Sequence, residues 1–185
     1  MKRSTLISIV HKAFNLLSDV TVENLELLPS EGSLLIVMNH VSYTDFPLLA
    51  VQHRRDDWSA FITDKYKNVR FLQWVVKSLD LVWIDRTRAD FSAVKAAYTW
   101  LKQGGAFALS PEGTRSKTGS LNQGKEGVAM IALKAGVPIV PAAVVGTERF
   151  FADLKRLRRP KLTLRFGLPV SYEPIDPARR AESLR

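Results

Sequence analysis

Short apolar runs alternate with longer amphipathic segments along most of this chain. Five runs are short enough for strands, and they cover residues 34–38, 81–84, 106–109, 138–145 and 162–166. Four segments carry apolar residues at helical spacing, and they cover residues 46–53, 71–79, 91–101 and 125–135. Strands that alternate with helices predict an α/β fold, with a largely parallel (mixed) open sheet flanked by helices. Because 185 residues suffice for one well-filled core, we expect a single domain.

Two of the predicted strands have a distinctive composition. Pro141 lies inside the run at 138–145, and since proline has no backbone N–H to donate, this predicts an edge strand or a bulge. The run at 162–166 alternates apolar and polar residues, which predicts one solvated face.

The N-terminal segment is amphipathic. Residues 4–18 place apolar side chains at helical spacing, namely Leu6, Ile9, Val10, Ala13, Phe14 and Leu17. We therefore expect an amphipathic helix within residues 1–20, which either lies in a membrane interface or packs on the domain. The apolar run 6–10 is too short for a signal peptide, and no run approaches the roughly 20 apolar residues of a transmembrane helix. We expect a protein that is not exported.

The chain is basic and has no cysteine. It has 27 Lys and Arg against 18 Asp and Glu, a net charge of +9 and an isoelectric point near 10.0. Such a surface favours nucleic acid, an anionic membrane or a phosphorylated substrate, although solubility alone explains it equally well. The missing cysteines exclude disulfides, thiolate metal sites and a cysteine nucleophile.

Three clusters of reactive residue types each follow a predicted strand directly. They are Asn39–Asp45, Asp85–Arg86 and Ser110–Ser116. In open α/β sheets ligands bind outside the carboxyl ends of the strands, so the three clusters are expected on one rim of the sheet.

His40 and Asp45 are candidates for a general base and its partner. On a continuous helix, five residues would turn them about 140° apart, so they meet only across a strand-to-helix corner. A carboxylate on one imidazole nitrogen leaves the other nitrogen to accept a proton. The alternative is a capping Asp45 with a half-exposed His40. Ser42 lacks the surroundings of a nucleophile elbow, and no histidine has a close His or Cys partner for a metal.

Arg86 and Arg115 suit a phosphate, because a guanidinium donates in a planar, bidentate way and stays charged. Gly113 allows close approach of a ligand, and Glu112 is able to accept from a hydroxyl or to pair with an arginine. Lys65 is a further cation on the same grounds. The alternative is a surface cluster of ion pairs.

Taken together, these residues resemble the lysophosphatidic acid acyltransferase family, the 1-acyl-sn-glycerol-3-phosphate acyltransferases. The family's Asn-His-x4-Asp is present at Asn39–Asp45, Pro-Glu-Gly-Thr-Arg-Ser at Pro111–Ser116, and Val-Pro-Ile-Val-Pro at Val137–Pro141. The family's Gly-x-x-Phe-Ile-Asp-Arg appears at Asp80–Arg86, with Asp80 and Trp83 replacing the glycine and the phenylalanine. We expect both replacements to lie beside the acceptor site.

The resemblance implies a glycerol-3-phosphate acyltransferase-like fold, with the acyltransferase domain at residues 21–185. It implies transfer of a fatty acyl group from acyl-CoA or acyl carrier protein to the sn-2 hydroxyl of 1-acyl-glycerol-3-phosphate, giving phosphatidic acid. In that reaction His40 deprotonates the hydroxyl and Asp45 orients His40. The implied acceptor and phosphate site comprises Arg86, Glu112, Gly113, Thr114, Arg115 and Lys65, and the implied acyl or acceptor channel comprises Val137, Pro138, Ile139 and Pro141. No covalent intermediate, cofactor or metal is implied.

The implied partners are a lysophospholipid acceptor, the acyl donor and an anionic membrane, contacted peripherally at its cytoplasmic face through residues 4–18 and 149–161. Nucleic acid is not expected, since no RNA-recognition or helix-turn-helix pattern is present. Three alternatives remain open at this point. They are a related acyltransferase with another acceptor (glycerol-3-phosphate, another lysophospholipid or an acylated amino-acid lipid), a non-enzymatic module that binds anionic lipid or nucleic acid, and a phosphate-ester hydrolase.

Overall fold

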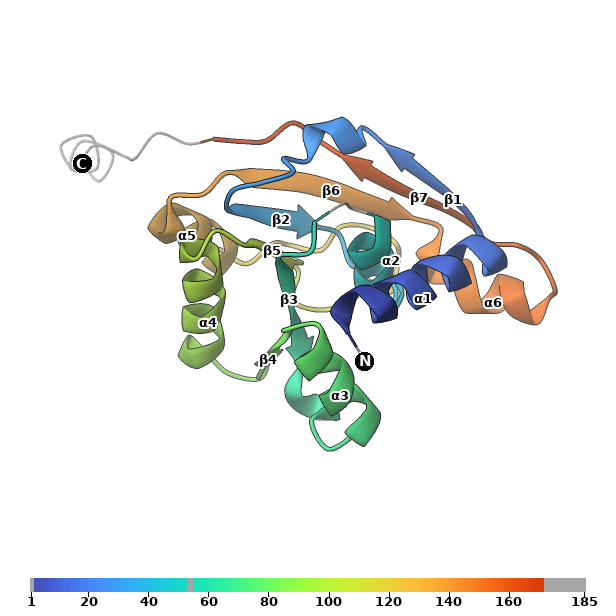
Figure 1. Ribbon diagram of the computed structural model, residues 1–185, viewed down its shortest axis with the longest axis horizontal. Coiled ribbons are helices and arrows are strands. Elements are labelled where there is room, and N and C mark those ends of the chain that lie inside the picture. The colour runs from blue at the N-terminus through green and yellow to red at the C-terminus, as the bar shows by residue number, and fades with distance from the viewer. Residues whose placement is uncertain (1, 53–54, 172–185) are drawn as a thin grey trace.

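The computed structural model describes residues 2–52 and 55–171, which form one seven-stranded sheet with helices on both faces (Figure 1). The strand order is β1-β7-β6-β2-β5-β3-β4, and every neighbouring pair is parallel except β6 with β7. The strands are β1 (Asp19–Glu23), β2 (Leu34–Met38), β3 (Trp58–Thr63), β4 (Val82–Ile84), β5 (Ala106–Leu109), β6 (Ile139–Val145) and β7 (Lys161–Phe166). The predicted mixed, largely parallel sheet in a single domain is confirmed.

Six α-helices lie in the described part of the chain. They are α1 (Arg3–Leu17), α2 (Asp45–Gln52), α3 (Arg70–Ser78), α4 (Phe91–Lys102), α5 (Gly127–Ala135) and α6 (Phe150–Lys155). Short 3₁₀ turns are η1 (Leu25–Leu27), η2 (Asp64–Tyr66) and η3 (Thr147–Arg149). All predicted helices are present within a few residues. Residue 53 of the predicted helix 46–53, and residues 172–185 of the predicted domain, lie outside the described residues.

Two strands, β1 and β3, were not predicted from the sequence. β1 alternates its two valines with Asp19, Thr21 and Glu23 over only five residues, and it pairs with β7 at the end of the sheet. β3 follows a charged segment and mixes serine and threonine with apolar residues. Both strands mix polar with apolar residues, so neither forms a continuous apolar run, and their pairing partners lie far away in the sequence.

β6 lies inside the sheet, between β2 and β7, so the edge alternative for the strand that contains Pro141 is wrong. The register agrees with the bulge alternative. Ile139 pairs with Val170 and Ala142 with Phe166, so two residues of β6 oppose three residues of the other segment. Pro141 lies within this offset region, where the regular hydrogen bonding between β6 and the other segment is already interrupted. The proline's missing N–H therefore does not break a regular pairing.

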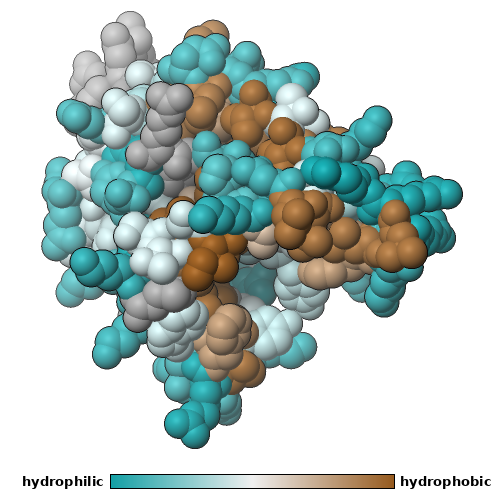
Figure 2. Space-filling model, turned by 45° about the vertical axis from the view of Figure 1, so that its right-hand side comes forward, coloured by the Kyte–Doolittle hydropathy of each residue, from teal (hydrophilic) through white to brown (hydrophobic). Residues whose placement is uncertain are grey.

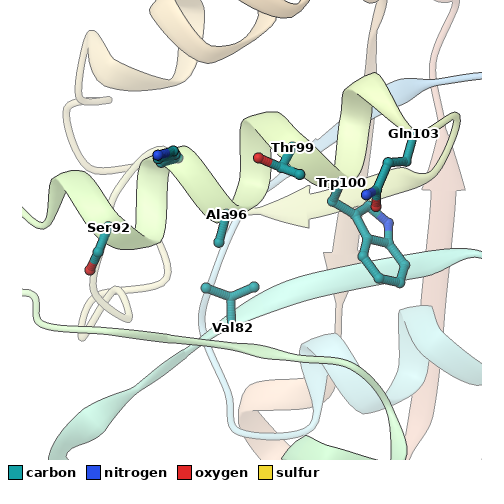
Figure 3. Close-up of a pocket in the computed structure, with 7 residues that line it drawn as sticks. Val82, Ser92, Ala96, Thr99, Trp100 and Gln103 are labelled. Carbon is teal, nitrogen blue, oxygen red and sulfur yellow. The ribbon is translucent and has the colours of Figure 1, made fainter.

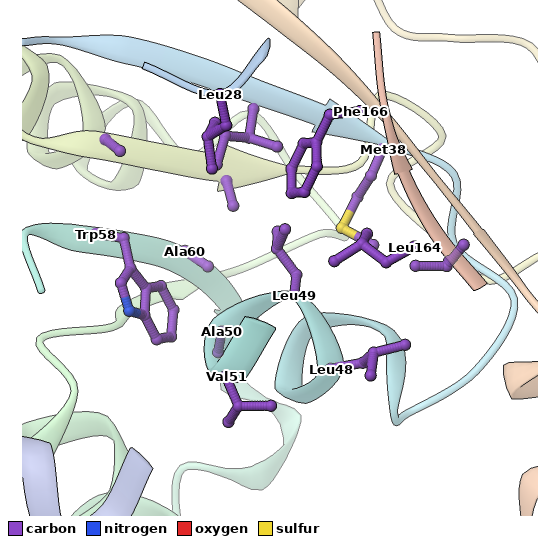
Figure 4. Close-up of a cluster of buried hydrophobic side chains, with 14 of the residues drawn as sticks. Leu28, Met38, Leu48, Leu49, Ala50, Val51, Trp58, Ala60, Leu164 and Phe166 are labelled. Atoms are coloured by element: carbon purple, nitrogen blue, oxygen red, sulfur yellow. The ribbon is translucent and has the colours of Figure 1, made fainter. Parts of the chain in front are cut away.

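The core has two layers, one on each face of the sheet. β2 contributes Leu34, Ile36 and Met38 to one layer and Leu35 to the other, which explains why this central strand is a continuous apolar run. The first layer packs against α1, α2 and α6, and Figure 4 shows Leu49 of α2 reaching toward Met38 and Phe166. The second layer packs against α4 and α5, whose buried alanines allow close approach to the sheet.

Helix α1 packs on the domain. Leu6 and Phe14 are buried against the first layer, and the Phe14 ring lies 5.6 Å from that of Phe150 in α6. Ile9, Leu16 and Leu17 are exposed, so the apolar positions of this helix divide between the core and solvent.

Arg3 anchors the start of α1 to the turn between α3 and β4. Its guanidinium donates to the carbonyl of Leu79 at 2.9 Å and to the carboxylate of Asp80 at 3.1 Å. Asp80 has a φ of 52°, a left-handed conformation in which glycine is normally favoured. The expectation that Asp80 lies beside the acceptor site is wrong, because this turn precedes β4 whereas Arg86 follows it. The aspartate instead holds α1.

We expect Arg3→Ala to lower the free energy of unfolding by about 1–3 kcal/mol, because carbonyl and carboxylate acceptors lose a charged, partly buried donor. Urea denaturation measures this change. Arg149→Ala is the matched control, since the Arg149–Asp153 ion pair is long, at 3.6 Å, and the Arg149 side chain is 62% exposed. The control should cost less than about 0.5 kcal/mol. Equal losses in the two variants would rule out the anchor.

Candidate active site

His40 and Asp45 meet at the corner between β2 and α2. His40 Nδ1 lies 2.8 Å from Asp45 Oδ2, and the same oxygen accepts the backbone N–H groups of Val41 at 2.7 Å and Ser42 at 2.8 Å. Asp45 is fully buried, whereas the His40 side chain is 15% exposed. Because an ionised carboxylate only accepts, Nδ1 carries the proton and Nε2 is left to accept one. Asp45 therefore both closes the corner and orients the imidazole.

The backbone of His40 is held by the loop that follows β5. Its N–H donates to Glu112 Oε1 at 3.1 Å, and its carbonyl accepts from the N–H of Ser116 at 2.7 Å. The other carboxylate oxygen of Glu112 accepts from the backbone and side chain of Asn122, at 3.1 and 2.8 Å. Glu112 borders the candidate phosphate pocket, but both of its oxygens are engaged within the protein. Glu112 therefore holds the His40 backbone in position and ties it to Asn122.

Asn39 fixes the corner from the opposite side. Its side-chain amide donates to the carbonyl of Val144 at 2.9 Å and accepts from the N–H of Val144 at 2.8 Å. The amide thus forms a ladder-like pair with β6 where β2 has ended. Asn39 was recognised in the sequence only as part of a motif.

A cavity of about 300 Å³ lies beside this corner and is lined by Arg86, Glu112, Gly113, Thr114, Arg115 and Lys125. Arg86 Nη1 donates to the carbonyl of Gly113 at 2.9 Å. Gly113 has a φ of 64°, and a Cβ there would lie 3.1 Å from Cε and Nζ of Lys125. The structure therefore brings Arg86, Arg115 and the 112–114 segment together, as expected, and adds Lys125. Lys125 was not among the predicted site residues, because it is one of many cations in a basic chain.

Arg115 is held at the mouth of the cavity by Tyr43. Its Nη2 donates to the hydroxyl of Tyr43 at 2.9 Å, and its guanidinium carbon lies 3.6 Å from the centre of the Tyr43 ring. The hydroxyl of Tyr66 lies 3.3 Å from that of Tyr43. Both tyrosines were missed in the sequence, because Tyr43 stands at an unspecified position of His-x4-Asp and Tyr66 lies outside every motif.

The pKa values of the two tyrosines shift in opposite directions, and nearby cations contribute to both shifts. The hydrogen bond with Tyr66 lowers the pKa of Tyr43, and the positive charges of Arg115 and Lys65 lower it further. The hydrogen bond with Tyr43 raises the pKa of Tyr66, while the positive charges of Arg115 and Arg86 oppose that rise. Lys65, on η2, therefore lies within electrostatic reach of the same site as the two arginines.

The residues expected to form an acyl or acceptor channel lie outside the cationic pocket. Val137 is buried, and the carbonyl of Pro138 accepts from the N–H of Leu35 near the beginning of β2, at the sheet edge opposite His40. Ile139 packs in the second core layer. None of these residues, nor Pro141, lines the cavity beside Arg86 and Arg115. These contacts place the four residues at the beginning of β6 and just before it, and their role in an acyl or acceptor channel stays a prediction.

A second cavity, of about 420 Å³, lies along α4 against β4 (Figure 3). Its lining is mainly apolar and comprises Val82, Ser92, Lys95, Ala96, Thr99, Trp100 and Gln103. The indole N–H of Trp100 donates to the carbonyl of Ala106 at 3.0 Å, which fixes the ring in the wall. The cavity shares no lining residue with the cationic pocket, so the two are separate sites.

Two properties of the described residues bear on the site. Within residues 2–52 and 55–171, no three His, Cys, Asp or Glu side chains gather as metal ligands do. Over the same ranges, no helix combines the length and the apolar character needed to cross a bilayer.

These features describe an α/β domain with a His–carboxylate pair beside a pocket lined by cations, and comparison with known proteins identifies the family. A sequence model of the Acyltransferase family matches residues 19–145. The chain belongs to this acyltransferase family, whose members transfer acyl groups.

Individual relatives agree with this. The chain is 29% identical, over 85% of its length, to a probable 1-acyl-sn-glycerol-3-phosphate acyltransferase of Mycoplasma pneumoniae. It is 30% identical, over 70% of its length, to the chloroplastic 1-acyl-sn-glycerol-3-phosphate acyltransferase LPAT1 of Arabidopsis thaliana. It spans 62% and 37% of the lengths of these two relatives.

A solved structure confirms the fold. The crystal structure of the 1-acyl-sn-glycerophosphate acyltransferase PlsC from Thermotoga maritima matches with a TM-score of 0.74 and 28% identity. The match covers 98% of this chain and 77% of that one.

We expect Glu112→Gln to lower the maximal rate of acyl transfer by about tenfold or more, with little change in the KM for the acceptor. An amide accepts at only one of its two ends, so either the His40 N–H or the two donors of Asn122 would lose their acceptor, and the link between the two segments would break. Steady-state kinetics separates the two parameters. A rise in KM without a loss of rate would instead place Glu112 on the acceptor.

Proposed function

We propose that this chain transfers a fatty acyl group from acyl-CoA or acyl carrier protein to the sn-2 hydroxyl of 1-acyl-glycerol-3-phosphate, forming phosphatidic acid. The observation that carries the proposal is the oriented His40–Asp45 pair bonded to the loop of a cationic pocket. The named activities of the relatives point to the same acceptor.

The proposed reaction needs only a general base. His40 Nε2 takes the proton of the acceptor hydroxyl as its oxygen attacks the thioester carbonyl carbon. The new C–O bond forms, the C–S bond breaks, and the imidazolium returns the proton to the departing thiolate. Asp45 stabilises the imidazolium through Nδ1–H. A base of this kind contributes about 10²–10⁴-fold to the rate. The proposal includes no acyl-enzyme, cofactor or metal.

The acceptor phosphate is assigned to the cationic pocket. Arg86, Arg115 and Lys125 line it, and Lys65 lies nearby. A phosphomonoester carries about 1.5 to 2 negative charges near pH 7, which matches a cluster of cations better than a neutral headgroup does. Thr114 and the backbone at Gly113 complete the lining, and Tyr43 keeps Arg115 in place. A lipid acceptor also implies work at a membrane surface, which we place at the cytoplasmic face as a peripheral contact.

We expect His40→Ala to lower transfer by about 10²–10⁴-fold. The assay mixes detergent-dispersed lysophosphatidic acid with a long-chain acyl-CoA and follows the CoA thiol with a chromogenic disulfide. The protein has no cysteine, so it adds no background. His11→Ala, on α1 away from the corner, is the matched control and should keep the rate.

Thiol release that depends on the acceptor and is lost in His40→Ala supports the proposal. Release that survives His40→Ala would refute the mechanism. Transfer to glycerol-3-phosphate or another lysolipid, but not to lysophosphatidic acid, would refute the acceptor while keeping the reaction.

We expect Lys125→Ala and Arg115→Ala each to raise the KM for lysophosphatidic acid by about tenfold, because each removes a charge-assisted contact to phosphate. The KM for a neutral monoacylglycerol should change little. Lys134→Ala, an exposed charge on α5, controls for net charge. Equal effects on both acceptors would mean that these cations do not bind the phosphate.

A further inference from the structure

Helix α3 presents an aromatic surface that the site does not use. Phe71 is 65% exposed and Trp74 is 37% exposed, and Val69, just before the helix, is also exposed. The rings of Phe71 and Trp74 lie 5.8 Å apart, so they form one patch. Only Val76 of this helix is fully buried, which leaves most of the helix on the outside of the domain.

Cations border this aromatic patch. Lys67, Arg70 and Lys77 are all exposed, and Asp64 is the only acidic residue from 64 to 79. Arg70, Trp74 and Lys77 recur at helical spacing, so basic side chains stand beside the indole on one stripe. Figure 2 shows hydrophobic and hydrophilic side chains next to each other on the lower lobe of the molecule, where α3 lies in Figure 1.

The position of α3 links this surface to the acceptor pocket. The helix follows directly on η2, which carries Lys65 and Tyr66, and the Tyr66 hydroxyl lies 3.3 Å from that of Tyr43. Anything that binds the outer face of α3 would therefore lie next to the mouth of the cationic cavity, where Tyr43 holds Arg115. This matters for a lipid acceptor, which must move from a bilayer into the pocket.

We propose that α3 docks the protein on an anionic lipid bilayer, with Phe71 and Trp74 inserted at the level of the headgroups and Lys67, Arg70 and Lys77 on the lipid phosphates. Aromatic rings favour this interfacial depth, and basic side chains are attracted to the anionic surface. The charge complementarity and the exposed rings carry the proposal, and its purpose rests on the proposed lipid acceptor. It assigns to α3 a contact that the sequence suggested for residues 4–18 and 149–161.

The other two segments fit this role less well. In α6, Phe150 is buried against Phe14 of α1, so only Phe151 of that aromatic pair is exposed. The exposed apolar residues of α1 (Ile9, Leu16 and Leu17) are aliphatic, whereas the exposed rings of α3 are aromatic.

Vesicle co-sedimentation tests the proposal with the full chain and without any acyl donor. Wild-type protein should bind vesicles of phosphatidylcholine with phosphatidylglycerol and bind poorly to phosphatidylcholine alone. Phe71→Ser with Trp74→Ser should weaken binding by about tenfold or more, and Lys67→Gln with Arg70→Gln and Lys77→Gln should do the same. Phe91→Ser is the matched control, since this aromatic of α4 is 81% exposed.

Quenching by brominated lipids locates the inserted residue. The chain has four tryptophans, and Trp74→Phe should abolish most of the quenching while vesicle binding persists. Unchanged quenching in Trp74→Phe, or wild-type vesicle binding by both α3 variants, would overturn the proposal. If the α3 variants bound vesicles as the wild type does but no longer bound the acidic acyl carrier protein, the proposal would also be overturned, and α3 would instead bind a protein partner.

A micellar transfer assay separates this inference from the proposed function. The Phe71→Ser, Trp74→Ser variant should keep the wild-type rate on detergent-dispersed acceptor and lose at least about tenfold on acceptor presented in vesicles. Inactive wild-type protein in micelles would refute the proposed function alone, and vesicle binding would still decide the role of α3.

Discussion

The buried carboxylate of Asp45 is the interaction on which the site depends. Taking an ionised carboxylate out of water costs several kcal/mol unless donors surround it. Here one oxygen accepts the Nδ1–H of His40 and two backbone N–H groups. The same bonds that stabilise the buried charge also close the turn from β2 to α2 and set the tautomer of the imidazole. Stability of the corner and preparation of the base are therefore one property.

This corner is further fixed by segments that are distant in the sequence. The loop after β5 bonds to both backbone polar groups of His40, and β6 bonds to the side chain of Asn39. These contacts exist because β5 and β6 flank β2 in the sheet. The loop that ties His40 also carries Gly113 and Arg115, so a ligand in the cationic pocket is held by the segment that holds the base. Positioning of this kind is a large part of what an active site contributes to rate.

The positive charges of the chain are unevenly distributed over the described residues. Arg86, Arg115 and Lys125 gather in one pocket, with Lys65 beside it, and further cations border the exposed rings of α3 close by. Asp80 shows the opposite use of charge, since it stands in a left-handed turn and pairs with Arg3 to hold α1. That replacement of the family's glycine is explained by an anchor at the other end of β4, and not by the acceptor.

Much of this was determined by the sequence alone. The central strands are apolar runs because both of their faces are buried, and the helices show their period because one face is buried. The spacing of His40 and Asp45 required a corner, and the structure has one. Tertiary structure decided the rest. It placed β6 inside the sheet, gave the oxygens of Glu112 to His40 and Asn122, and brought Lys125, Tyr43 and Tyr66 to the pocket. It also placed Pro138 beside the beginning of β2, at the end of that strand opposite His40. Periodicity and short turns are local, so the sequence displays them directly. A hydrogen bond such as that between Glu112 and His40, which are 72 residues apart, depends on which strands become neighbours, and that choice is made only when the whole core packs.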